Sequence, residues 1–286
     1  MWLALALAAS TSTALGTVLT KDLVNRLPAR QVIAPLFLIN AALATPLFAI
    51  PSLGGGSTWH LLDPTVLALH ACSVLLMVVA SSAFFRLIDR GSASAVSIGT
   101  ALSPVVTLLA TPLLLAVAIP WGLAGGALTL VAGVLIALRG QFAGIRAPAA
   151  VGLLTSYAVC QGVLIVLAAA LFVRGVSLPE VYVSRTALAG LVFLGLAWPR
   201  AVHLRDLPVL IRRAGLITLG FLLALSAVRI SSPVAVQSTL AVTPLLVITI
   251  ESIWLRRWPS RRIVLAGLVC CGGVFLLLRS GSLSLG

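Results

Sequence analysis

Charged residues are scarce in this sequence, and acidic ones are the scarcest. Asp, Glu, Lys and Arg make up 9% of the 286 residues, and only six of them are acids, whereas roughly 25% of a soluble domain is charged. Apolar residues make up 60% of the chain, in runs that repeatedly reach the ~20 residues needed to cross a bilayer. Because no soluble fold could bury so much apolar surface, the sequence predicts an integral membrane protein.

The scarcity of acids also argues against enzyme chemistry. The sequence has no His-Glu-x-x-His motif, no P-loop and no paired intramembrane aspartates. Its short basic loops lack the acidic clusters that would hold Mg²⁺, and its four cysteines lie in apolar runs without zinc or disulfide spacing. The net charge of +13 is scattered over many loops and forms no basic patch with interleaved aromatics. We therefore predict no catalytic residues, no metal, no cofactor and no nucleic-acid partner.

Proline and glycine breakers divide the apolar runs into ten predicted transmembrane helices. Their approximate ranges are 2–19, 32–50, 65–85, 93–117, 120–138, 151–172, 179–198, 212–228, 232–255 and 262–278. The apolar start has no basic residue ahead of it, unlike a signal peptide, so we interpret it as the first helix. The predicted fold class is an all-α integral membrane protein.

An internal repeat joins the two halves of the sequence. The segment ASAVSIGTALSP (93–104) aligns with SPVAVQSTLAVTP (232–244), so that Pro104 falls on Pro244 at an offset of 140 residues. After a two-residue slip, the segments 123–139 and 265–279 also agree. We infer two five-helix units, 1–146 and 147–286. Because five is odd, the second unit must enter the membrane from the opposite side, as in the inverted repeats of secondary transporters.

The positive charges lie unevenly between the two sides of the predicted bundle. Fifteen of the 19 basic residues fall in the loops after the odd-numbered helices, three on the other side and one, Arg185, inside the seventh helix. The fifteen are Lys21, Arg26, Arg30, Arg86, Arg90, Arg139, Arg146, Arg200, Arg205, Arg212, Arg213, Arg256, Arg257, Arg261 and Arg262. The positive-inside rule places these loops in the cytoplasm and both termini outside, in a bacterial-type inner membrane.

With this repeat, the chain resembles the drug/metabolite transporter superfamily, EamA type, over essentially its whole length. The resemblance rests on the five-plus-five repeat, the runs before Pro104 and Pro244, and the Gly-Val-Leu type endings of helices five and ten. It implies ten helices around a central cavity, with helices four and nine among its walls, and export or import of amino acids, nucleosides, sugars or drugs. The Gly-Glu that the family often places after these two helices is absent, and its termini are usually drawn in the cytoplasm.

Polar residues form one stripe on each of helices four and nine, because residues three, four and seven apart share a helix face. The stripes are Ser97, Thr100, Pro104, Thr107 and Thr111, and Gln237, Ala241, Pro244, Ile248 and Glu251. Polar groups are costly in hydrocarbon, so both faces are expected to point into the bundle. They line a cavity or they pack against neighbouring helices, and the sequence leaves both open. The candidate cavity-lining residues are Ser97, Thr100, Pro104, Gln237, Pro244, Tyr157, Gln161, Asn40 and Arg185.

Two charged residues have two open interpretations each. Glu251 is a candidate coupling or gating carboxylate, or it pairs with nearby arginines at the interface. Arg185 holds an anionic group of the substrate, or it is a buried structural cation bonded to carbonyls or to Glu180. His70 forms a further helical stripe with Ser73, Met77 and Ser81, and as a lone histidine in a membrane helix it is interpreted as a packing residue.

The predicted function is that of a secondary transporter. It moves a small metabolite or drug-like solute by alternating access, with a central site between the repeats and protons as the candidate coupling ion. A lipid-linked flippase, or an accessory membrane subunit of the same fold, is the alternative. The sequence does not determine the substrate, the direction of transport, or whether the protein is a monomer or a homodimer.

Overall fold

The chain folds into a bundle of α-helices, as the sequence predicts, with no β-strand among the described residues. The computed structural model describes residues 1–50, 63–90, 93–138, 148–196, 206–254 and 261–279. In chain order the elements are α1 (Trp2–Arg26), α2 (Ala29–Ala44), the 3-10 helix η1 (Thr45–Ala49), α4 (Pro64–Arg90), α5 (Ala93–Leu115), α6 (Trp121–Leu138), α7 (Pro148–Val173), α8 (Leu178–Leu196), α9 (Leu207–Arg229), α10 (Pro233–Leu240), α11 (Thr243–Trp254) and α12 (Arg261–Arg279). Each predicted span coincides with one element, or with two consecutive elements.

Many of the helices have the length and composition of membrane spans. Six stretches of the described chain qualify on both counts, in α1, α2 with η1, α4, α7, α9, and α10 continued into α11. Shorter apolar helices cover Gly99–Leu115, Trp121–Ile136 and Leu265–Arg279. The chain is therefore a multi-pass membrane protein.

Many large apolar side chains lie on the outer surface, unlike those of a soluble protein, although the interior is apolar as well. Leu109, Leu113 and Leu196 each leave 64% or more of their surface exposed, while Ser103 and Thr239 are fully buried. Apolar side chains on the outside suit a hydrocarbon solvent, and polar groups avoid it by bonding inside the bundle. The outer surface is thus built to contact lipid.

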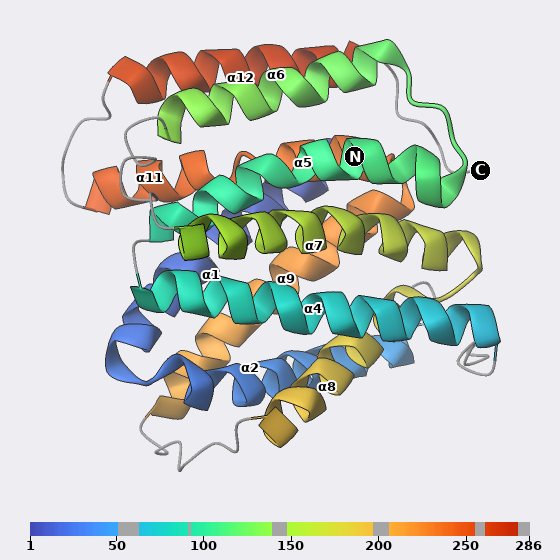
Figure 1. Ribbon diagram of the computed structural model, residues 1–286, viewed down its shortest axis with the longest axis vertical. Helices are drawn as coiled ribbons and strands as arrows, with labels where there is room; N and C mark the ends of the chain where they lie inside the picture. The colour runs from blue at the N-terminus through green and yellow to red at the C-terminus, as the bar shows by residue number, and fades with distance from the viewer. Residues whose placement is uncertain (51–62, 91–92, 139–147, 197–205, 255–260, 280–286) are drawn as a thin grey trace.

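The helices are arranged as a row of packed pairs (Figure 1). The α6 and α12 helices form one end of the molecule and α2 and α8 the other, with α1, α4, α5, α7 and α9 between them. Within this middle part, α1 packs on α9, and α7 packs on both α4 and α5. The centre of the bundle is therefore surrounded by helices from both halves of the sequence.

Several boundaries differ from the sequence-based prediction, and the end of α4, at Arg90, lies five residues beyond the predicted one. The α1 helix continues to Arg26, because no proline or glycine breaks it in the preceding turns. It ends there because Leu27 precedes Pro28, and helical backbone angles are disfavoured for a residue that precedes a proline. The α9 helix begins at Leu207, with a proline in its first turn, five residues before the predicted start. The predicted second helix ends in a 3-10 turn that has Pro46 at its start.

The predicted ninth helix is divided into α10 and α11. Pro244 has no N–H to donate to the carbonyl of Leu240, and that carbonyl accepts a 2.6 Å hydrogen bond from the Thr243 hydroxyl instead. Residues 241 and 242 form a turn between the two helices. The break therefore lies where the sequence places a proline in the middle of a membrane span.

Candidate functional site: a central cavity

A cavity lies at the centre of the bundle. It is lined by residues of α1, α2, α4, α5, α7, α8, α9, α10 and α11, and so by both halves of the chain. About 150 Å³ of it is open to the centres of water-sized molecules, where a single water needs only ~10–15 Å³. The cavity is therefore large enough for a small organic solute.

The cavity gathers most of the residues that the sequence nominated. Seven of these residues line it: Asn40, Thr100, Tyr157, Gln161, Arg185, Gln237 and Pro244. Pro104 is buried in α5 but is not among the lining residues. The side chains of Ser97 and Glu251 lie outside the described residues.

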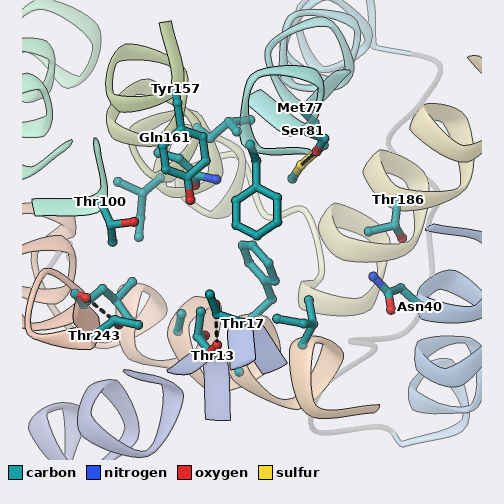
Figure 2. Close-up of a pocket in the computed structure, with 18 of the residues that line it drawn as sticks. Thr13, Thr17, Asn40, Met77, Ser81, Thr100, Tyr157, Gln161, Thr186 and Thr243 are labelled. Carbon is teal, nitrogen blue, oxygen red and sulfur yellow. Dashed lines mark hydrogen bonds between the residues drawn. The ribbon is translucent and has the colours of Figure 1, made fainter. Parts of the chain in front are cut away.

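The polar groups surround the cavity from several sides. Figure 2 shows Tyr157 and Gln161 together on one wall, Thr13 and Thr17 on the facing wall, and Asn40 apart from both. Aromatic side chains of α4 and α9 also line the cavity: Phe84, Phe85 and Phe221. A solute inside would meet apolar surface together with hydroxyl and amide groups. Sites that bind small molecules commonly have this composition.

The stripe of the predicted fourth helix, now α5, divides into two parts. Thr100 lines the cavity, and the nearby Ser103 hydroxyl accepts a 2.6 Å hydrogen bond from Gln237 Nε2, which links α5 to α10. Thr107 donates toward the carbonyl of Gly162 on α7 at 3.0 Å, and Thr111 donates to the carbonyl of Thr107 at 2.7 Å. The part near Gln237 therefore faces the cavity, whereas beyond it Thr107 bonds to α7 and Thr111 bonds within α5.

Arg185 reaches the cavity from α8. Its side chain is 3% exposed, and its guanidinium carbon lies 6.0 Å from the centre of the Phe221 ring. Its Nε has no hydrogen-bond partner. The sequence indicates this residue as a candidate because it is a charged side chain within an apolar run.

Arg213 is a second cavity-lining arginine, and its assignment to a cytoplasmic loop was wrong. It lies in the second turn of α9 and is 6% exposed. Its Nε donates a 2.9 Å hydrogen bond to the Thr20 hydroxyl of α1, and its guanidinium carbon lies 5.9 Å from the centre of the Phe85 ring. The predicted range of the eighth helix, 212–228, already includes this position, so the loop count was inconsistent with it.

His70 lies outside the cavity lining, between α4 and α8. The Ser184 hydroxyl donates its one hydrogen to the carbonyl of Glu180, so it accepts the 3.0 Å bond from His70 Nδ1. The other ring nitrogen, Nε2, has no partner. This contact ties α4 to α8 beside the cavity and agrees with a packing role.

A central cavity with polar side chains on its walls, inside a multi-pass helical bundle, is typical of membrane transporters. The EamA-like transporter family, which is part of the drug/metabolite transporter superfamily, matches this chain over residues 1–139. The first part of the chain thus matches the family that the whole sequence resembles. The typical activity of that family is transport and not catalysis.

The fold also has a counterpart among solved structures. The crystal structure of another protein superimposes on this chain with a TM-score of 0.69. The alignment covers 96% of this chain and 95% of the other chain, at 18% sequence identity. At this identity the likeness concerns the fold alone. No curated protein matches the sequence.

Proposed function

We propose that the protein is a secondary transporter that moves a small organic solute across the cytoplasmic membrane by alternating access, with the central cavity as its site. The observation that carries this proposal is a solute-sized cavity lined by polar side chains from both halves of the chain. Secondary transporters bind their substrates at the interface between repeats, near the middle of the bilayer. The flippase alternative stays a prediction.

The packing of the helices supports division into the repeats 1–146 and 147–286. If the halves correspond in order, α1 matches α7, α2 matches α8, α4 matches α9, and α6 matches α12. The α1–α9 contact then corresponds to the α7–α4 contact, and the α2–α8 and α6–α12 contacts each join an element to its own counterpart. A two-fold relation between inverted repeats produces this pattern.

The break between α10 and α11 supplies a point of movement. Thr243 and Pro244 line the cavity at the break. Discontinuous helices form the substrate sites of several transporter folds, because their unwound carbonyls can turn toward a solute. We propose that the angle between α10 and α11 changes when the protein passes between the states in which the cavity is open to one side of the membrane and to the other.

A bulky residue in the cavity tests the proposal. Thr100→Trp would fill the space on the α5 side and is expected to abolish solute exchange in proteoliposomes. Leu109→Trp, at a position on α5 that is 64% exposed, is the control and should exchange normally. Equal exchange by the two variants would show that the solute passes elsewhere.

The proposal includes protons as the coupling ion and Glu251 as the group that carries them. It rests on the sequence, in which Glu251 lies deep within an apolar run. Glu251→Gln should abolish accumulation driven by a pH gradient and leave exchange intact. A normal gradient response in this variant would assign Glu251 to pairing with arginines at the interface, where an exposed pair is worth only ~0–1 kcal/mol.

We propose that both termini face away from the cytoplasm. Removal of Arg213 from the loop charges leaves fourteen on one side against three on the other, so the asymmetry persists. A C-terminal reporter that fluoresces only in the cytoplasm should stay dark. Bright fluorescence of the full-length fusion contradicts this orientation.

A further inference from the structure

The described walls of the cavity carry positive charge and no carboxylate. Arg185 and Arg213 line the cavity, and an arginine stays protonated in a protein. Glu180, five residues before Arg185, is buried in the same helix but is not among the lining residues. Even if Glu180 is ionised, two cations against one carboxylate leave a positive charge beside the cavity.

The protein contacts described for the two guanidinium groups use only part of their bonding capacity. A guanidinium has five N–H donors. Arg213 places one of them on Thr20, and Arg185 Nε has no partner. The rings of Phe221 and Phe85 add cation–π contacts, which offset only part of the cost of removing a charge from water. An anion in the cavity would supply both the acceptors and the opposite charge.

The remaining walls favour an apolar body attached to that anion. Phe84, Phe85 and Phe221 line the cavity, and Met77 lies near them on α4. An inorganic anion would leave these surfaces uncovered, whereas an organic acid would bury them and gain from the hydrophobic effect.

We infer that the solute bears an anionic group, a carboxylate or a phosphate, that binds Arg185 and Arg213, and an apolar body that lies against the phenylalanine rings. This inference rests on the proposed function, because it names the substrate class of the same cavity. Arginine suits both groups, since its planar fork pairs with two oxygens at once.

Matched probes of one shape and different charge test the inference on the purified full-length protein. The probes are 3-phenylpropionate, its neutral amide 3-phenylpropionamide, and phenyl phosphate, with binding measured by calorimetry and by thermal shift. The carboxylate or the phosphate should bind at least about 30-fold more tightly than the amide, because only an anion compensates the buried arginines. The stronger of the two acids identifies the anionic group.

Arginine variants assign the binding to the cavity. Arg185→Gln should weaken binding of the preferred acid by about 30-fold or more, the effect of removing one member of a buried charge pair. Arg174→Gln is the matched control, because Arg174 is exposed at the end of α7 and donates to the carbonyl of Ala170. It should bind the acid as the parent does. Arg185→Lys keeps the charge but loses the fork, so its affinity should lie between those of the parent and the Gln variant.

Several results would overturn the inference. They are equal binding of the acid and the amide, binding by none of the probes, and unchanged acid binding when Arg185 is replaced. If the Gln variant does not fold, the Arg185→Lys variant replaces it. Unchanged acid binding by the Lys variant would then overturn the inference, and weakened acid binding with unchanged amide binding would support it. The proposed function fails separately, through equal exchange by Thr100→Trp and Leu109→Trp.

Discussion

The α6–α12 pair and the walls of the cavity are joined in different ways. Between α6 and α12 the contact is made by glycine against apolar side chains, as where Gly273 faces Leu130 and Gly126 faces Leu277. Around the cavity, arginine, glutamine and hydroxyl groups from several helices meet with space left between them. One region is packed without charge, and the other keeps its polar groups around a void.

The difference indicates what each region can do. Close packing through small residues is the usual way to join helices in lipid, where burial of apolar surface gives little driving force. Intramembrane charges are expensive and are retained mainly where they serve a function. Substitutions in the α6–α12 pair should therefore change stability, and substitutions around the cavity should change solute binding or movement.

The largest effect is expected in the mode of transport. A bound anion neutralises the positive charges of Arg185 and Arg213. Without it, the empty protein would have to reorient from one side of the membrane to the other with these charges unpaired, at a cost of several kcal/mol. Because each 1.36 kcal/mol of barrier slows a step tenfold, exchange should exceed net efflux by at least about tenfold. The measurement is efflux of labelled 3-phenylpropionate from proteoliposomes with and without unlabelled solute outside. Equal rates would mean that the charges do not limit the empty protein.

A smaller effect is expected at the glycine contact. A Cβ atom on Gly273 would lie 2.9 Å from the backbone N of Leu130, so α6 and α12 would have to move apart. Gly273→Ala should lower the free energy of unfolding by about 1–3 kcal/mol, as overpacking does, and leave solute affinity unchanged. Thermal unfolding in detergent measures the first and calorimetry the second.

The neighbouring glycine is the control for this change. A Cβ atom on Gly272 would meet no atom of another helix within 4 Å, so Gly272→Ala should be neutral or stabilising by up to about 1 kcal/mol. If both alanine variants lose the same stability, the close contact at Gly273 is not what joins the two helices.

The smallest effect is expected at Gln237. Its amide lines the cavity and donates a 2.6 Å hydrogen bond to Ser103. Gln237→Ala should weaken solute binding by about 2–10-fold, the value of ~0.5–1.5 kcal/mol for one hydrogen bond. Thr111→Val is the control, because the Thr111 hydroxyl bonds within α5 and is not among the cavity-lining residues. A loss of binding in the Thr111 variant that equals the loss in the Gln237 variant would remove the distinction between packing and cavity positions.

Much of the fold could be predicted from the sequence, because membrane spans leave a strong signal in composition. The all-α class, the positions of the helices and the resemblance to the family that matches residues 1–139 were found from apolar runs, breakers and the repeat. The end of α1 and the start of α9 were misplaced. The predicted ranges ended at residue 19 and began at residue 212, whereas Pro28 and Pro208 mark the two boundaries.

The cavity residues were predictable in part. Gln237, Thr100 and Arg185 stand out as polar groups in apolar runs, and all three line the cavity. Phe85 and Phe221 could not be found this way. An aromatic residue in a membrane helix can face lipid, a neighbouring helix or a cavity, and the sequence does not distinguish these three positions. Their role depends on long-range packing of α4, α8 and α9.

Two-sided labelling of Thr243→Cys shows whether the cavity opens alternately to the two sides of the membrane. The four native cysteines are first replaced, since Cys72 and Cys271 are exposed. A membrane-impermeant maleimide is then applied to right-side-out and to inverted vesicles, with Arg174→Cys as a position that should react from one side only. The Thr243→Cys variant should react in both kinds of vesicle, because Thr243 lines the cavity. Reaction from a single side, with the control behaving as expected, would contradict alternating access through this cavity.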